Sequence, residues 1–294
     1  MSSPDGTPPV SSTRSVAEVR RALLTSARFE VVPLKSVAAQ IDHLPAGCEV
    51  SVTCSPTKGI GPTIELAAHV QALGHHAVPH LSARLVEDVD HVRRLAKACR
   101  EHGFTEVFLV AGDVPTAVGQ YEGVVELLRD LLDADAGLTR IGVTAYPDEH
   151  PLIDRAVVHE ALHAKQAVLA EAGIDAYAST QMCFDIGAWK MWAANERASG
   201  LNLPLHLGVP GVIDRTKLLT IGMRLGVGAS LRFVKKNQGT LRRLFAPSGY
   251  DPSKMLDGLV GDADALGIEA LHVFTFNSVD TTAAWRARQL ESRV

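Results

Sequence analysis

Polar side chains stand in or at the ends of several apolar segments of this sequence, where a packed core would not place them. Six of them come from six different segments: Glu30, Thr53, His80, Asp113, Tyr146 and Gln181. Carboxyl, imidazole, phenol and amide groups can exchange protons with a bound molecule or hydrogen-bond it. A single polar residue near the end of a segment means little, but six at equivalent positions predict one shared functional site.

A second pattern with chemical potential is His159-Glu160-Ala-Leu-His163, which matches the His-Glu-x-x-His arrangement of zinc hydrolases. On a helix it places two imidazoles on one face with the glutamate between them. The pattern lies in the helical segment after the fifth apolar run, away from the six polar residues, and no third ligand follows at a recognisable spacing. A zinc hydrolase therefore stays as the alternative function, and no metal ligands are assigned.

Composition and charge restrict the class of protein. The chain has 294 residues, of which 46% are hydrophobic, and its 29 basic and 33 acidic side chains give a formal net charge of −4. This length supports one large core, and a mildly acidic chain is not typical of proteins that bind the nucleic-acid backbone. No apolar stretch approaches the roughly 18 residues of a membrane span.

The N-terminus and the cysteines indicate where the protein works. Residues 1–13 are rich in proline and serine and do not have the pattern of a secretory signal, so a flexible tail is expected there. The four cysteines are far apart in the sequence and form no paired motif: Cys48, Cys54, Cys99 and Cys183. They are expected to be reduced thiols of a cytoplasmic protein that binds neither membrane nor nucleic acid.

Short apolar or β-branched runs alternate with segments whose apolar residues recur every three or four positions. The runs are Phe29–Pro33, Glu49–Cys54, His76–Leu81, Glu106–Ala111, Arg140–Tyr146, Ala176–Phe184, Leu203–Val209 and Ala270–Asn277. Eight such units in about 250 residues predict a (β/α)8 barrel over residues 14–294 as a single domain. An extra helix is expected at 14–26, and another around Leu231–Phe245 before the last strand. An open dinucleotide-binding sheet is less favoured, because no Gly-x-Gly-x-x-Gly follows the first run.

The barrel explains why the polar residues matter. The C-terminal ends of all eight strands meet at one mouth, where barrel enzymes carry out their chemistry. The six polar residues are therefore expected to converge at this mouth.

These residues resemble, in the same order, motifs of the methylenetetrahydrofolate reductase family. The matching segments are Phe29-Glu30-Val-Val-Pro33, Ser51-Val52-Thr53, Pro79-His80-Leu81, Gly112-Asp113-Val-Pro115, Ala145-Tyr146-Pro147-Asp-Glu-His150-Pro151, Thr180-Gln181 followed by Asp185, Gly208-Val-Pro210 and Phe274-Thr-Phe-Asn277. Each motif is short, but all eight occur in the family's order and span nearly the whole chain. The resemblance implies a (β/α)8 barrel.

The resemblance also implies an activity, the reduction of 5,10-methylenetetrahydrofolate to 5-methyltetrahydrofolate in one-carbon metabolism and methionine biosynthesis. Opening the folate's five-membered ring requires a proton on the leaving nitrogen, and this general-acid role falls to Glu30. Asp113 would stabilise the resulting iminium cation, and Gln181, Asp113 and Asn277 would bind the folate. Two structural alternatives stay open: an ion pair of Glu30 with a basic residue, and capping by Asp113 of a helix that begins near Tyr121.

Typical relatives bind FAD, which passes hydride from NAD(P)H to the folate. Cofactor-contacting positions of the family are matched by Thr53, His80, Asp113, Tyr121, Tyr146 and His150. Two basic anchors of FAD are replaced, by Ala111 and by Ala170. Charge-assisted contacts of this kind contribute roughly 1.5–3 kcal/mol each. The sequence is therefore similar to the smaller actinobacterial branch that works without flavin, and direct hydride transfer from NADH, or from NADPH, is expected; an ordinary FAD-dependent reductase is the alternative.

The position that holds the folate's glutamate tail differs from the family. Ser278 stands where many relatives have an arginine. Basic residues that could substitute are Lys235, Lys236, Arg242 and Arg243. The alternative interpretation of this basic run is a solvated helix face. The expected partners are thus the folate and a nicotinamide dinucleotide, and the oligomeric state is left open.

Overall fold

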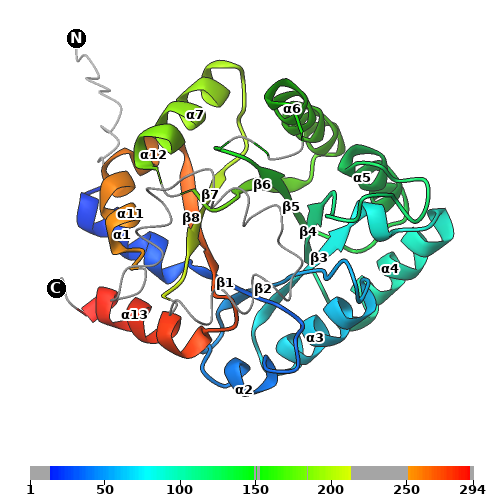
Figure 1. Ribbon diagram of the computed structural model, residues 1–294, viewed down its shortest axis with the longest axis horizontal. Coiled ribbons are helices and arrows are strands. Elements are labelled where there is room, and N and C mark those ends of the chain that lie inside the picture. The colour runs from blue at the N-terminus through cyan, green and yellow to red at the C-terminus, as the bar shows by residue number, and fades with distance from the viewer. Residues whose placement is uncertain (1–13, 149, 151–152, 184, 213–250, 292–294) are drawn as a thin grey trace, which may run out of the picture.

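A closed barrel of eight parallel strands forms the centre of the computed structural model, which describes residues 14–148, 150, 153–183, 185–212 and 251–291. The strands are β1 (Arg28–Val31), β2 (Glu49–Val52), β3 (His76–Ser82), β4 (Glu106–Val110), β5 (Arg140–Ala145), β6 (Asp175–Thr180), β7 (Leu205–Pro210) and β8 (Ile268–Phe274). Each strand pairs with the next along the chain, and β8 pairs with β1 to close the ring (Figure 1). The predicted (β/α)8 barrel is confirmed, and each of the eight predicted runs overlaps one strand.

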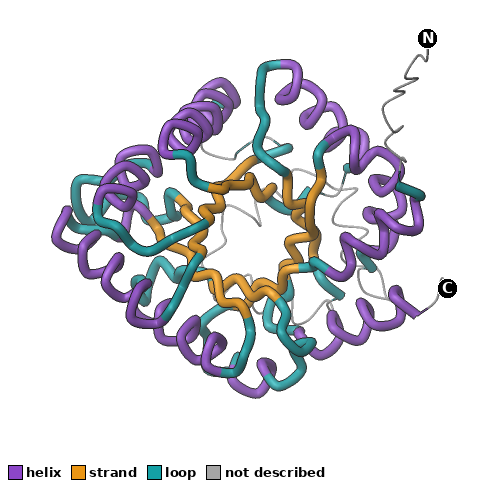
Figure 2. Tube along the Cα trace, turned by 180° about the vertical axis from the view of Figure 1, so that it is seen from behind, coloured by secondary structure: helices purple, strands orange, loops and turns teal. Residues whose placement is uncertain are grey.

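Helices cover the outside of this ring, as the view from behind shows (Figure 2). They are α1 (Val16–Thr25), α2 (Ala38–Ile41), α3 (Gly61–Ala72), α4 (Val89–His102), α5 (Val124–Asp133), α6 (Arg155–Ala172), α7 (Ile186–Ala198), α11 (Ser253–Leu259), α12 (Ala263–Leu266) and α13 (Val279–Glu291), with 3-10 turns at Ala83–Leu85 and Val260–Asp262. The helix expected at 14–26 is α1. The expected helix around Leu231–Phe245 and the expected tail at 1–13 lie outside the described residues. Within the described part of the chain, no helix is long and apolar enough to cross a membrane.

Local sequence signals explain where several helices begin and end. Ser15 and Glu18 form a reciprocal capping box at the start of α1. The Asp154 side chain accepts a hydrogen bond from the backbone at the start of α6, and Gly173 ends this helix in the left-handed conformation that glycine adopts without strain. These caps set where α1 begins and where α6 begins and ends.

Two layers of side chains differ in character. The large apolar core lies between the strands and the helices, while a small apolar cluster of Val78, Phe108 and Tyr177 lies apart from it. Gly142 of β5 makes room for this cluster, because a Cβ atom there would lie 2.3 Å from the Tyr177 ring. Polar residues complete the interior, which is unusual for a barrel core dominated by branched apolar side chains.

A charged cluster fills the interior around the start of β1. Arg28 is fully buried, and its guanidinium lies 2.6 Å from a carboxylate oxygen of Glu49 and 2.7 Å from one of Glu106. The guanidinium also hydrogen-bonds the hydroxyl of Tyr177, whose ring stacks on His206 at 3.8 Å. Arg28 lies two positions before Glu30 on β1, so this cluster fills the barrel next to Glu30, on the side away from the mouth.

Candidate active site

Glu30 lies on β1 with its carboxyl group inside the barrel, between two histidines. The Oε2 atom of Glu30 is 2.9 Å from Nε2 of His272 on β8, and His80 of β3 brings a ring nitrogen into the same group, whose members lie within 4.8 Å of one another. The Phe108 ring packs 4.7 Å from His80 and 5.9 Å from His272, centroid to centroid. Only 13% of the Glu30 side chain is exposed, so the carboxyl group faces an apolar and imidazole-lined interior.

The electrostatics of this group suit proton donation. Burial raises the pKa of Glu30 to about 7, whereas burial lowers the pKa of His80 and of His272 to about 3. Both imidazoles are therefore neutral near pH 7, while the carboxyl group is about half protonated. A carboxylic acid whose pKa lies near the working pH is an effective general acid.

The alternative interpretation is an ion pair of Glu30 with a basic residue. The residues that the structure describes include no lysine or arginine paired with Glu30. Arg28 lies nearby on β1, but its guanidinium pairs with Glu49 and Glu106. The partner of Glu30 is the neutral His272, which sequence reasoning missed. His272 lies in a strand that is buried on both faces, so the apolar pattern of the sequence did not show that its side chain points into the barrel.

Three buried polar atoms line this part of the barrel without a hydrogen-bond partner among the described residues: Ser51 Oγ, His80 Nε2 and His272 Nδ1. Ser51 lies beside Glu30 in the register of β1 and β2. Buried polar atoms in folded proteins are normally hydrogen-bonded. These atoms are therefore available to a bound molecule or to water, which supports a ligand site at Glu30.

Asp113, Tyr146 and His150 come together at the mouth. The rings of Tyr146 and His150 meet edge to face at 4.9 Å. Burial raises the pKa of Tyr146 and lowers that of His150, and the nearby Asp113 carboxylate acts on both groups by raising their pKa values. Gly112 holds a φ of +99°, and a Cβ atom there would lie 2.0 Å from Ser82 Oγ, so only glycine fits before Asp113.

The other alternative interpretation, that Asp113 caps a helix near Tyr121, is wrong. The helix in question, α5, begins at Val124, and its N-cap is Gly123 with no side-chain cap bond. Asp113 is exposed in the loop after β4. Its carboxylate is therefore available at the mouth.

Two further predicted residues follow strands at the same end. Thr53 is half-buried after β2, where its N–H donates to the Val31 carbonyl at 2.9 Å. Gln181 is exposed directly after β6, where its N–H donates to the Ala145 carbonyl at 2.8 Å. Backbone bonds thus fix both residues at the strand ends, as the barrel prediction requires.

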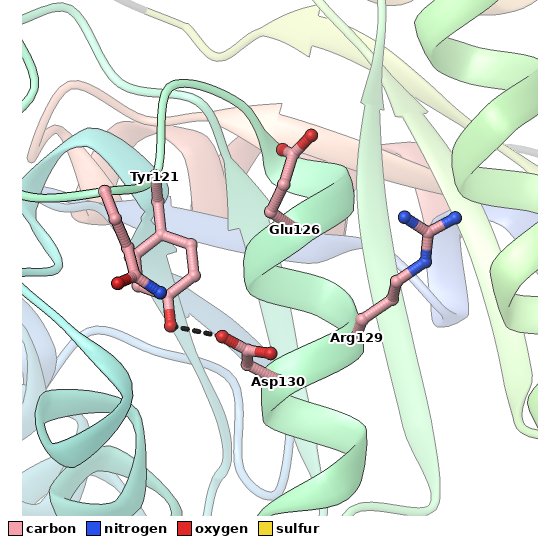
Figure 3. Close-up of a pocket in the computed structure, with 5 residues that line it drawn as sticks. Tyr121, Glu126, Arg129 and Asp130 are labelled. Atoms are coloured by element: carbon pink, nitrogen blue, oxygen red, sulfur yellow. Dashed lines mark hydrogen bonds between the residues drawn. The ribbon is translucent and has the colours of Figure 1, made fainter.

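The structure gives Tyr121 different surroundings. This side chain is 1% exposed, and its hydroxyl donates to Asp130 of α5 (Figure 3). It lines a shallow pocket of about 320 Å³ together with Gln120, Glu126, Arg129 and Asp130. None of these residues belongs to the Glu30 group, so the contacts do not connect Tyr121 with the other predicted site residues.

Asn277 has a clear structural task. Its side-chain oxygen accepts from the Val32 N–H at 2.8 Å, and its side-chain nitrogen donates to the Val32 carbonyl at 2.9 Å. The residue is 1% exposed and adopts a φ of +54°. These bonds tie the loop after β8 to the loop after β1. The basic residues expected to hold the folate tail, Lys235, Lys236, Arg242 and Arg243, lie outside the described residues.

The two positions where FAD anchors were expected differ in location. Ala111 directly follows β4, beside Asp113 at the mouth, so an alanine stands there in place of an arginine. Ala170 lies in the last turn of α6, which runs antiparallel to the strands, and a lysine at this position would be remote from the mouth. The alanine at position 170 is therefore no evidence for or against FAD binding. The inward-facing lysine of α6 is Lys165, whose buried ammonium donates to the Thr144 carbonyl at 2.8 Å.

Two cations near the mouth bond to other parts of the protein. Lys58 donates to the Pro33 carbonyl at 2.8 Å, and Arg84 donates to the Pro115 carbonyl at 2.9 Å and pairs with Glu122. The described residues thus offer no basic anchor at position 111 for the pyrophosphate of FAD. We derive no step of the chemistry through flavin.

The His159–His163 pattern lies on α6, outside the barrel, as predicted. Sequence spacing did not reveal a third side chain of ligand type, but α7 supplies one. Glu196 places Oε2 at 2.9 Å from His159 Nδ1 and at 3.0 Å from His163 Nε2. This second group shares no residue with the Glu30 group.

Comparison with known proteins connects the barrel to a family. Residues 35–222 match the family model described as methylenetetrahydrofolate reductase. Methylenetetrahydrofolate reductase 2 of Saccharomyces cerevisiae is 26% identical over 196 residues, which cover 60% of this chain and 30% of that protein. The chain thus matches under a third of the length of this curated relative.

One solved structure has a similar barrel over almost the whole chain. It is described as an uncharacterized protein from Clostridium thermocellum that binds two copies of 5-methyl-5,6,7,8-tetrahydrofolic acid. The TM-score is 0.60 at 12% sequence identity, over 93% of this chain and 98% of the other. A likeness at this identity shows the shared fold.

Proposed function

Because this chain belongs to the methylenetetrahydrofolate reductase family, we propose that it reduces 5,10-methylenetetrahydrofolate to 5-methyltetrahydrofolate with hydride taken directly from NADH. The observation that carries the proposal is the Glu30 carboxyl group, buried in the barrel with a pKa of about 7. The folate-binding barrel from Clostridium thermocellum supports a folate as the ligand of such a fold. The four cysteines of the chain are free thiols, which fits the reducing cytoplasm that we propose as its location.

The chemistry begins with a proton. The substrate holds its one-carbon unit in a ring between two nitrogens, and the ring opens when the leaving nitrogen receives a proton. Glu30 donates this proton, since a neutral carboxyl group is available near pH 7. The ring then opens to an iminium cation, and hydride adds to its carbon. One proton and one hydride enter the folate, and NAD⁺ leaves.

Neighbouring groups respond to the charges that appear. When Glu30 has given up its proton, the neutral His272 can donate from Nε2 to the new carboxylate across 2.9 Å. The exposed carboxylate of Asp113 at the mouth stabilises the iminium cation. Gln181, exposed at the end of β6, offers an amide to the pterin edge. Thr53, His80, Tyr146 and His150 remain for the nicotinamide dinucleotide.

The direct route rests on the electrostatics of the mouth. An alanine stands at position 111, and the nearby Lys58 and Arg84 already bond to backbone carbonyls. At position 111 a pyrophosphate of FAD would therefore lack the charge-assisted bond that an arginine there would give it. Hydride transfer then requires the nicotinamide C4 atom to approach the folate carbon to about 3–3.5 Å in one ternary complex.

The decisive experiment measures NADH oxidation by purified, flavin-free protein with and without methylenetetrahydrofolate. Oxidation that depends on the folate and needs no flavin is the expected result. Oxidation only after FAD is added would overturn the direct route and retain the reductase. A preference for NADPH at equal concentrations would correct the choice of dinucleotide. No oxidation under any of these conditions would refute the proposed function.

A further inference from the structure

A compact group of imidazole and carboxylate side chains bridges two helices outside the barrel. His159 and His163 lie one turn apart on α6, with ring centroids 4.4 Å apart, and both contact Glu196 of α7. Figure 1 shows α6 and α7 on the outside of the barrel. One oxygen of Glu196 lies 2.9 Å from Nδ1 of His159 and 3.0 Å from Nε2 of His163. Three ligand-type atoms from two helices thus converge on one point.

The Glu196 carboxylate is nearly buried beside the two histidines. The Glu196 side chain is 9% exposed, and no lysine or arginine pairs with it among the residues that the structure describes. A buried carboxylate without a lysine or arginine partner is costly unless its neighbours compensate it, and here those neighbours are the two imidazoles. A divalent cation held by the same three atoms would place a fixed positive charge beside this carboxylate.

The geometry suits a small transition-metal ion. Zinc binds imidazole nitrogens and carboxylate oxygens at about 2.0–2.2 Å, so neighbouring ligand atoms of a tetrahedral site are about 3.4 Å apart. The two distances to Glu196, 2.9 and 3.0 Å, need to open by only about 0.4 Å. Neutral imidazole favours zinc, nickel, cobalt or copper over magnesium or calcium, which prefer oxygen ligands.

Solvent can reach the group and complete the coordination. The side chains of His159 and His163 are 41% and 22% exposed. A cavity of about 150 Å³ is lined by Arg155 and Trp192, which lie one helical turn before His159 and Glu196 on α6 and α7. An ion can therefore enter from outside the protein, and water can occupy the remaining positions around it.

We propose that His159, His163 and Glu196 bind one divalent transition-metal ion of the zinc type, which ties α6 to α7. Each histidine uses the nitrogen that now faces Glu196 and carries its proton on the other ring nitrogen. The ion joins the two helices that follow β5 and β6, the strands whose ends carry Tyr146 and Gln181. This site is separate from the proposed reductase chemistry and does not depend on it.

The test uses the full chain after removal of metal with a chelator. Calorimetric titration with Zn²⁺ is expected to show one ion per chain, and Co²⁺ is expected to give the visible absorption of a nitrogen- and oxygen-ligated ion. Zn²⁺ at a hundredfold excess over its Kd should raise Tm by roughly 4 °C. Loss of a ligand is expected to weaken Zn²⁺ binding by more than about 100-fold, since even loss of a group behind a ligand costs 10–100-fold.

Matched variants locate the site. His163→Gln and Glu196→Gln should each lose the Zn²⁺ affinity. If His163→Gln fails to fold, Glu196→Gln still tests the site, because it replaces the carboxylate by an amide of nearly the same shape. His69→Gln, on the exposed face of α3, should bind Zn²⁺ as the parent does. Glu30, His80 and His272 form a second group of ligand-type atoms inside the barrel, so Glu30→Gln is a further control. It should bind Zn²⁺ as the parent does, because Glu30 is not a ligand of the proposed site. Undiminished binding by Glu196→Gln, loss of binding by Glu30→Gln, or no binding by the parent would each overturn the proposal.

Discussion

Replacement of Glu30 by glutamine tests the central residue of the site through both activity and stability. Burial raises the pKa of this carboxyl group from 4.5 to about 7, which corresponds to about 3 kcal/mol in favour of the protonated form. The side chain is only 13% exposed, so solvent screens this effect little. Glutamine has nearly the same shape and stays neutral, but it cannot donate the proton that ring opening needs under the proposed function.

The activity should follow the protonated fraction of Glu30. With a pKa of about 7, this fraction is about one half at pH 7, one tenth at pH 8 and one hundredth at pH 9. We expect kcat/KM for folate-dependent NADH oxidation to fall about tenfold per pH unit above 7. A general acid contributes about 10²- to 10⁴-fold, so Glu30→Gln should lose that factor in kcat and the pH dependence with it.

The same residue should make the folded protein less stable as pH rises. The folded-state pKa lies above the unfolded value, so between pH 4.5 and 7 the folded chain retains a proton that the unfolded chain releases. The free energy of unfolding should fall by about 3 kcal/mol across this window. At pH 8, Glu30→Gln should therefore be more stable than the parent by about 3 kcal/mol, or roughly 5 °C in Tm.

The assay pairs a pH series of kcat/KM with thermal unfolding at pH 5 and pH 8. Glu65→Gln, an exposed substitution on α3, serves as the control for the chemical change alone. Three results would refute the reasoning: a flat pH profile of the parent from 6 to 9, activity of Glu30→Gln within tenfold of the parent, or a Tm of Glu30→Gln below that of the parent at pH 8.

Three further substitutions test the surroundings of the site. Burial lowers the pKa of Lys165 to about 7, so the folded chain binds fewer protons than the unfolded chain between pH 7 and 10.5. The free energy of unfolding of the parent, measured in urea, should therefore rise by about 2 kcal/mol from pH 7 to 9. Lys165→Met should not show this rise. Asn277→Ala should lower the free energy of unfolding by about 2–4 kcal/mol, because the N–H and carbonyl of Val32 lose their partners; an unchanged urea midpoint would indicate a purely ligand-binding role. Gly142→Ala should destabilise by about 1–3 kcal/mol through its clash with Tyr177, and an unchanged Tm would show that the interior can yield.

The sequence allowed prediction of the barrel because its signal is repeated eight times. Apolar runs mark the strands, and their boundaries follow the pattern to within a few residues; the first run, Phe29–Pro33, corresponds to β1 at Arg28–Val31. The convergence of Asp113 with Tyr146 and His150 follows from the barrel, because all three follow the C-terminal ends of their strands. The barrel topology thus predicted which residues of the short motifs lie close together.

The interior of the barrel could not be predicted in the same way. Strands of a parallel barrel are buried on both faces, so apolar periodicity does not show which residues point inward. His272, which contacts Glu30, and the fully buried Arg28 are each a single polar residue in or next to an apolar run. The pairing of β1 with β8 brings His272 to Glu30 from 242 positions away. The same limit applies to Glu196, which lies 33 residues after His163 on another helix.

The buried charged cluster around Arg28 has a consequence for the order of events in a catalytic cycle. Arg28 and Tyr177 are fully buried and fill the barrel next to Glu30, and a guanidinium remains charged and accepts no proton. Among the described residues, these two side chains close the barrel on one side of Glu30, so water reaches it from the mouth, where the folate would enter under the proposed function. If Glu30 gives its proton to the folate, it can regain one only after the product has left. Under the proposed function, Glu30 takes up its next proton through the same opening by which the product leaves, so product departure and proton uptake are coupled.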